Sequence, residues 1–414
     1  MKFVDEFRDP AAARALVAAI TDLAAGDEFK FMEVCGGHTH TIYRHGIEHL
    51  LPPSVELVHG PGCPPVCVIP PMGRIDDAMW LAEQPDVVFT TFGDMMRVPG
   101  SRGNLLEAKA RGADVRFVYS PLDAVKIAID HPDKQVVFFA VGFETTAPST
   151  AVTLVRAKEL GLTNFSVFCN HVTIVPPIKA ILESPPDLRL SGFLGPGHVS
   201  TVVGLRPYRF VPEQYGKPIV VAGFEPLDIL ASVHMLLRQL RDGRCEVENQ
   251  YSRVVRSEGN RQALTLLAQT FVLRPPHFEW RGLGFISQSA LGIHPDYAEF
   301  DAERHFSMPG VRVADPKACQ CGEVLKGVIK PGSARCSVPR AHPRHRSARA
   351  WSHRKEHVPP TTTSVVCIGR RRHWWGGNAG RADRDGRRGG PGGFAAVRSL
   401  CARAQRARLL RPRE

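Results

Sequence analysis

The sequence predicts an α/β fold with two parallel-sheet βαβ lobes and a smaller mixed domain. Short β-rich runs, each ending in glycine or a polar turn, alternate with helix-like stretches, which is the pattern of βαβ units. The continuously apolar run Val136–Val141 is typical of a central strand covered on both faces. Strands are expected at residues 29–34, 55–58, 87–92, 115–119, 136–141, 165–168, 193–194 and 219–222.

Helical spacing of apolar residues predicts helices at Thr146–Leu160 and Pro226–Leu240. A division near residue 135 gives one lobe over residues 30–135 and a second over 136–242. After residue 242 the alternation fades, so residues 243–331 are expected to form the third domain, together with the N-terminal residues 1–29.

The net positive charge of the chain comes from its C-terminal segment. The 414 residues carry a net charge of +12, but residues 332–414 hold 20 Lys plus Arg and 4 Asp plus Glu, which leaves 33 minus 37, or −4, for the rest. Residues 1–331 therefore lack the excess of basic residues that is typical of proteins that bind nucleic acid or anionic membranes. The charged start Met1–Arg8 does not resemble an export signal, and no apolar run is long enough to span a membrane. We expect a cytoplasmic protein with reduced thiols, in which clustered cysteines indicate metal binding or redox chemistry.

The residues that follow the predicted strands are candidates for chemistry, because ligands of open α/β sheets bind beyond the carboxyl ends of strands. Cys35 precedes two glycines and an expected helix start, where backbone N–H groups lower a thiol pKa and favour a reactive or metal-binding thiolate. A buried cysteine packed as a small hydrophobe is the alternative. For His38, a core or capping role is as plausible as a functional one.

Cys63 and Cys67 lie in a Pro- and Gly-rich turn, which suits a dithiol or a metal chelate better than core packing. Their C-x-x-x-C spacing is one residue longer than the redox or zinc C-x-x-C. Glu144 and Glu225 occupy matching Gly-Phe-Glu turns and are either cleft carboxylates or helix N-terminal charges. The loop at Gly142 lacks the further glycines of a dinucleotide site, so no nicotinamide cofactor is expected.

Together these motifs resemble the HypD family of hydrogenase maturation proteins, over about residues 3–331. The resemblance rests on the segments Cys35–His40, Gly60–Cys67, Gly93-Asp94, Arg97–Gly100, Gly142–Thr146, Gly195–Val199, Gly223–Asp228, Glu248–Tyr251 and Cys321–Leu325.

The resemblance implies a scaffold that assembles the Fe(CN)2CO group of nickel–iron hydrogenases with a HypC-type chaperone and a HypE-type cyanide donor. It implies that Cys35 holds the iron and that Cys63 and Cys67 share it or supply electrons. His38 either supports the iron ligands from behind or handles protons. Glu144 is grouped with these catalytic residues. It further implies a [4Fe-4S] cluster in the third domain, with Cys319 and Cys321 as ligands. Such a protein is an assembly scaffold with thiol redox chemistry rather than a conventional turnover enzyme; the alternative is a stand-alone thiol or iron–sulfur oxidoreductase.

The chain departs from the family pattern in two places. Pro65 lies within the cysteine pair and Pro71 before Met72, and each adds one residue to the family's motif. After Pro331 the sequence becomes rich in Arg and Gly. The cysteines in this segment, Cys336, Cys367 and Cys401, do not have the family's spacings.

The Arg-rich segment is consistent with a change of reading frame. Allowed codons for Gly332–Val366, read one base out of frame, can encode a cysteine-containing segment that resembles the family's C-terminal end. Our interpretation is that a single-base frameshift produced residues 332–414. Nucleic-acid binding is expected only if this segment is genuine.

Overall fold

The computed structural model describes residues 5–62, 70–184, 189–274, 277–315 and 319–330. It confirms the predicted α/β class, because both larger sheets consist of parallel strands connected through helices. In the part of the chain that is described, no helix is both long and apolar enough to cross a membrane.

The first sheet has the strand order β2-β1-β7-β8-β9 and is parallel throughout. Its strands are β1 (Phe29–Glu33), β2 (Val55–His59), β7 (Gly192–Pro196), β8 (Ile219–Ala222) and β9 (Val247–Asn249). The helices of this lobe are α1 (Pro10–Ala24), α2 (Gly36–His45), α8 (Val175–Leu182), α9 (Gly197–Val203), α10 (Phe210–Tyr215) and α11 (Pro226–Arg241).

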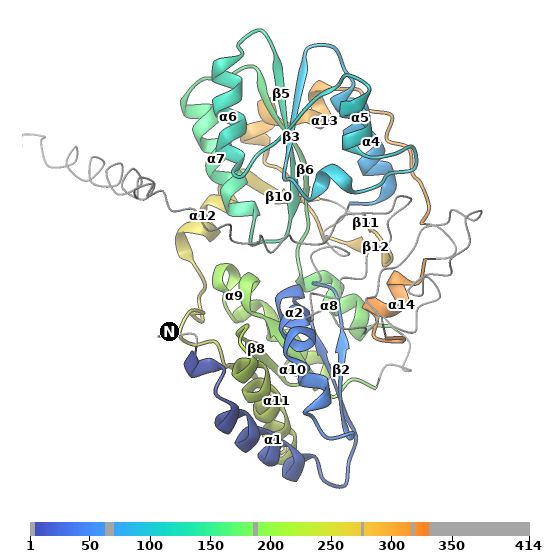
Figure 1. Ribbon diagram of the computed structural model, residues 1–414. Coiled ribbons are helices and arrows are strands. Elements are labelled where there is room, and N and C mark those ends of the chain that lie inside the picture. Colours follow the sequence, from blue (N-terminus) through green and yellow to red (C-terminus); the bar gives the residue numbers. More distant parts are fainter. Residues whose placement is uncertain (1–4, 63–69, 185–188, 275–276, 316–318, 331–414) are drawn as a thin grey trace, which may run out of the picture. The chain divides into compact units, whose positions relative to one another are not determined.

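The second sheet has the order β4-β3-β5-β6 and is also parallel. Its strands are β3 (Val87–Thr91), β4 (Asp114–Phe117), β5 (Gln135–Gly142) and β6 (Phe165–His171), and its helices are α4 (Met72–Ala82), α5 (Leu105–Ala110), α6 (Pro121–Asp130) and α7 (Ala147–Glu159). Alternate residues of β5 pack against α6 and α7 on one face and against α4 and α5 on the other (Figure 1). This explains why β5 is apolar at successive positions.

The strand pairing differs from the expected division near residue 135. Strands β3 and β4, assigned to the same lobe as Cys35, lie in one sheet with β5 and β6 through the pairing of β3 with β5, whereas β1 pairs with β7 from the second half of the chain. The chain thus leaves the first sheet after β2, builds the second sheet, and returns at β7. The sequence alternates between strands and helices in the same way whichever sheet a strand joins. This alternation therefore does not show that the chain moves to the second sheet and returns to the first.

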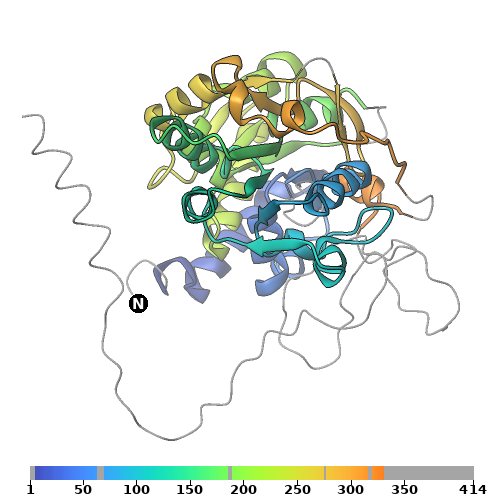
Figure 2. The same ribbon diagram turned by 90° about the horizontal axis from the view of Figure 1, so that it is seen from above.

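The described segments between residues 251 and 330 pack on the lobes and contain only short elements. They form the strand pairs β10 (Phe271–Leu273) with β13 (Leu291–Ile293) and β11 (His277–Trp280) with β12 (Gly284–Ser287), and the helices α12 (Arg261–Thr270), α13 (Ala302–His305) and α14 (Cys321–Leu325). Helix α12 lies beside α7, the yellow and green helices of Figure 2. The N-terminal helix α1 does not join these segments as expected; it packs along α11 of the first lobe (Figure 1).

Candidate functional site

Cys35 lies where β1 ends and α2 begins, at the carboxyl edge of the first sheet. Its thiol is buried, with 7% of the residue exposed, and its backbone N–H donates to Glu33 Oε2 at 2.9 Å. The N–H of Gly36 donates to the carbonyl of Gly62 at 2.6 Å. The residue before Cys63 is therefore in contact with the residue after Cys35, as the strand-end argument requires.

The backbone at position 62, in the second motif, requires glycine. Its φ of 148° is in the region that favours glycine, and a Cβ there would lie 2.2 Å from the carbonyl oxygen of Val34. Only a residue without a side chain lets this loop run against the end of β1. Cys63 and Cys67 themselves lie outside the described residues.

One imidazole approaches the Cys35 thiol, and a second lies in the helix that Cys35 caps. His198, at the start of α9, places Nδ1 3.9 Å from Cys35 Sγ, and its ring stacks on Phe224 with centroids 3.8 Å apart and an interplanar angle of 18°. His38 is fully buried in α2, and its Nε2 lies 3.1 Å from the carbonyl oxygen of Ala222. Because a carbonyl only accepts, Nε2 carries the proton, and Nδ1 of His38 is a lone-pair acceptor without a partner among the described residues.

The electrostatics of Cys35 correct the prediction from sequence. Burial raises the pKa of its thiol to about 12, and the nearby Glu33 carboxylate adds to this, while backbone N–H groups at the helix start oppose it. The helix N-terminus is present as predicted, but desolvation outweighs it. Burial likewise lowers the pKa of His38 and of His198, so near neutral pH the site holds a neutral thiol and neutral imidazoles.

Glu33 is a buried carboxylate that the strand-end search missed. Besides the Cys35 N–H, it accepts from Thr39 Oγ1 and forms a 2.7 Å contact with His59 Nδ1, and His59 Nε2 lies 2.9 Å from the Tyr43 hydroxyl. Glu33 is the last residue of β1, and the sequence prediction considered only residues that follow the strands. A carboxylate between the apolar residues Met32 and Val34 is the signal that would have found it.

Glu144 lies in the turn after β5 and is buried among apolar side chains. One carboxylate oxygen accepts from the N–H of Ile174 at 3.1 Å, and the other has no partner among the described residues. No described hydrogen bond joins it to Cys35 or His38. Glu225, in the matching turn, is a helix N-terminal charge: it forms a capping box with Asp228 at the start of α11 and pairs with Arg8.

Glu144 makes the free energy of unfolding depend on pH. Burial raises its pKa from 4.5 to about 7, so the folded protein binds this proton more tightly than the unfolded chain. The folded state is therefore penalised as pH rises above 4.5, and the penalty is complete above about 7. Between pH 5 and pH 8, we expect the wild type to lose about 2 kcal/mol more than Glu144→Gln in urea unfolding. The exposed control Glu159→Gln should follow the wild type; equal pH slopes for Glu144→Gln and the wild type would contradict the assignment.

The two cysteines predicted as cluster ligands are only partly described. Cys319 is partly buried, packs against the apolar cluster that contains Trp280, and forms a disulfide. Cys321 begins α14, and its side chain lies outside the described residues. Within the described ranges, no group of three or more His, Cys, Asp or Glu side chains could hold a metal ion.

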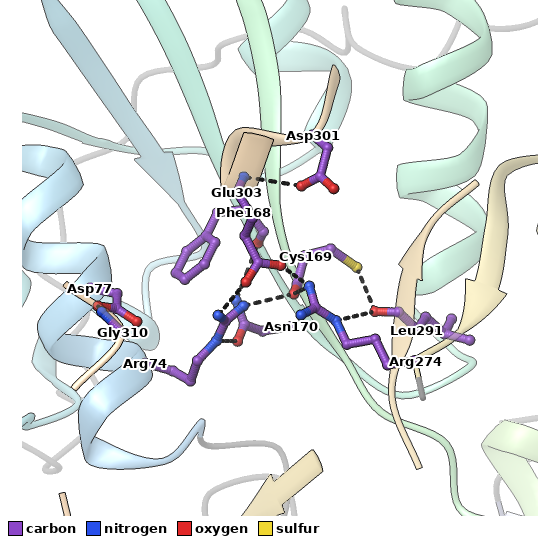
Figure 3. Close-up of polar contacts among 10 residues, drawn as sticks. All are labelled: Arg74, Asp77, Phe168, Cys169, Asn170, Arg274, Leu291, Asp301, Glu303 and Gly310. Carbon is purple, nitrogen blue, oxygen red and sulfur yellow. Dashed lines mark hydrogen bonds and ion pairs between the residues drawn. The ribbon is translucent and has the colours of Figure 1, made fainter. Parts of the chain in front are cut away.

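A second polar cluster, which no sequence motif predicts, lies at the end of β6 (Figure 3). Arg74 in the first turn of α4 donates to Glu303 Oε1 at 2.5 Å and to Asn170 Oδ1 at 2.7 Å, and its guanidinium lies 4.2 Å from the Phe168 ring centroid. Arg274 donates to the other oxygen of Glu303. One carboxylate on α13 thus joins two guanidinium groups from distant parts of the chain.

The fold and the site together define a class: a two-lobed parallel α/β protein with a glycine-framed, buried thiol and neighbouring imidazoles at its strand ends. Residues 11–345 match the HypD family, described as the hydrogenase formation hypA family. The chain is 53% identical over 342 residues to the hydrogenase maturation factor HypD of Rhizobium leguminosarum bv. viciae, covering 81% of this chain and 88% of that protein. It is 54% identical over 337 residues to the hydrogenase expression/formation protein HupD of Azotobacter chroococcum mcd 1 (80% and 88% covered). It is 50% identical over 337 residues to HypD of Escherichia coli strain K12 (80% and 89% covered).

The chain belongs to the HypD family, and its role is in hydrogenase maturation.

Proposed function

We propose that the chain is the scaffold on which the Fe(CN)2CO group of nickel–iron hydrogenases is assembled, with the iron as cargo bound through Cys35. The observation that carries this proposal is the placement of Cys35: a buried thiol, 3.9 Å from a histidine nitrogen, whose helix is hydrogen-bonded to the residue before Cys63. Soft thiolates suit low-valent iron with cyanide and carbonyl ligands. A thiol whose pKa is raised by burial stays protonated in the free protein, and binding of a metal ion displaces this proton.

The neighbouring groups have proposed roles that follow from their hydrogen bonds. Nδ1 of His38 is a buried lone pair that can accept a proton in the site, because its Nε2–H is already committed to the carbonyl of Ala222. Glu33 fixes the backbone of Cys35 and, through His59, the hydroxyl of Tyr43. Cys63 and Cys67 are proposed to share the iron or to supply electrons as a dithiol, and Glu144 to be a proton-holding carboxylate.

A resident [4Fe-4S] cluster with Cys319 and Cys321 as ligands remains an expectation from the family resemblance. The described residues do not fit such a cluster, since they contain no group of three metal-ligating side chains and the sulfur of Cys319 is in a disulfide. The proposed function therefore involves no step at this cluster.

The test is anaerobic co-purification of the wild-type chain with a HypC-type chaperone, in cells that also contain a HypE-type cyanide donor and iron. We expect stoichiometric iron and infrared bands of cyanide and carbonyl ligands in the purified complex. A chaperone complex without these bands, from cells in which a HypD relative yields them, would rule the scaffold out. Disulfide reductase activity without bound iron would instead favour a stand-alone thiol oxidoreductase.

A further inference from the structure

Phe224 connects three elements at the Cys35 site. It follows β8, directly before the start of α11, and its ring stacks on His198 of α9 at 3.8 Å and lies 5.1 Å from the ring of His38 in α2. Its carbonyl accepts from Thr41 Oγ1 in α2. A single aromatic residue therefore contacts the imidazole that approaches the thiol and the imidazole of His38.

The glycines of two motifs make room for this ring. A Cβ on Gly37 would lie 2.6 Å from two carbons of the Phe224 ring. A Cβ on Gly197 would lie 3.0 Å from the other side of the same ring and 2.3 Å from the carbonyl of Ala222. The first turns of α2 and α9 thus approach Phe224 as closely as they do because neither carries a side chain there.

His198 depends on this ring for its orientation. The side chain of His198 is exposed, and the contacts that define its ring position are the stack on Phe224 and the 3.9 Å approach of Nδ1 to Cys35 Sγ. An exposed imidazole without such a stack exchanges between rotamers. Tyr251 in turn makes a T-shaped contact with Phe224, with ring centroids 5.7 Å apart and an interplanar angle of 90°, which restricts the Phe224 ring.

We propose that Phe224 is a positioning residue, which acts through His198 by holding the imidazole over the Cys35 thiol. This deepens the proposed function, because the site positioned is the one assigned to iron. The geometric claim also stands without iron, so it can be tested separately.

The test is a double-mutant cycle read from the alkylation rate of Cys35 in the metal-free full-length chain, quantified by mass spectrometry of the Cys35 peptide. We expect His198→Ala to raise the rate about fivefold, because the imidazole covers a thiol that is otherwise buried, and Phe224→Leu to raise it about threefold. In the His198→Ala background, Phe224→Leu should change the rate by less than about 1.5-fold, since the residue through which it acts is gone. Equal effects of Phe224→Leu in both backgrounds, or none in either, would overturn the proposal.

Two further variants separate positioning from general loosening of the fold. Phe165→Leu removes a fully buried ring from β6 and Gly93→Ala adds a methyl where no heavy atom lies within 4 Å, so both should leave Cys35 alkylation at the wild-type rate. If Phe224→Leu does not fold, Gly37→Ala displaces the same ring and should show the same dependence on His198; an effect of Gly37→Ala that persists in His198→Ala contradicts the proposal.

The infrared spectrum distinguishes a failure of positioning from a failure of the proposed function. If wild-type complexes show cyanide and carbonyl bands, Phe224→Leu should shift their frequencies at unchanged iron content. If the wild type shows no such bands, the scaffold function fails while the alkylation cycle still decides the role of Phe224.

Discussion

Replacing Cys35 with alanine is expected to reduce the iron that co-purifies with the chaperone complex below about a tenth of the wild-type amount and to remove the cyanide and carbonyl bands. Cys35 is the described thiol at the carboxyl edge of the first sheet, and its backbone is held by Glu33 and by the neighbouring Gly36–Gly62 hydrogen bond. Alanine fits the same buried, extended N-cap position, so we expect the fold to be kept while the iron ligand is lost. The measurements are metal analysis and infrared spectroscopy on anaerobic preparations.

Other cysteines of the chain provide the matched controls. Cys169 is a free, fully buried thiol in β6 that donates to the carbonyl of Leu291, and Cys245 is a free, partly buried thiol after α11. Cys245→Ser and Cys169→Ala should retain wild-type iron and bands, because neither thiol contacts the Cys35 site. Wild-type iron and bands in Cys35→Ala would show that the iron is held elsewhere.

The sequence predicted the elements of the fold better than their assembly. Local periodicity and glycine turns located the strands, and parallel strands place their carboxyl ends on one edge, which is why Cys35 and Gly62 could be expected to meet. Which strands pair depends on contacts between residues far apart in the sequence, such as β1 with β7, and no local pattern encodes these.

Local sequence patterns also did not determine the chemistry of the site, because it depends on long-range contacts. A helix start next to Cys35 predicted a lowered thiol pKa, but the outcome depends on the balance between N–H groups and burial, and burial is a property of the whole fold. Phe224 was visible only as part of a Gly-Phe-Glu turn, and its contact with Gly37 required the structure. The pairing of Arg74 with Glu303 joins residues 229 positions apart.

The Arg74–Glu303–Arg274 cluster leads to the second prediction. Glu303 has 22% of its side chain exposed, and the side chains of Arg74 and Arg274, which share it, have 18% and 26% exposed. Both arginines also donate to the backbone carbonyl of Cys169 in β6, so the cluster ties α4, β6 and α13 together (Figure 3). Removing the carboxylate leaves two largely buried positive charges facing each other.

We expect Glu303→Ala to lower the free energy of unfolding by about 3 kcal/mol, which is near the lower end for a broken buried ion pair because these groups keep some contact with water. Urea unfolding at neutral pH measures the loss. Glu159→Ala breaks the exposed pair with Arg156, whose side chains are more than half exposed, and should cost less than about 0.5 kcal/mol.

A compensating variant distinguishes unpaired charge from lost packing. In the triple variant Arg74→Met, Arg274→Met and Glu303→Leu, no charge of the cluster remains, and apolar side chains fill a similar volume. We expect this variant to be more stable than Glu303→Ala, since replacing a whole buried ion cluster is far less costly than removing one partner. A triple variant that is less stable than Glu303→Ala would show that the hydrogen bonds to Asn170 and to the carbonyl of Cys169, rather than the charge balance, stabilise this junction.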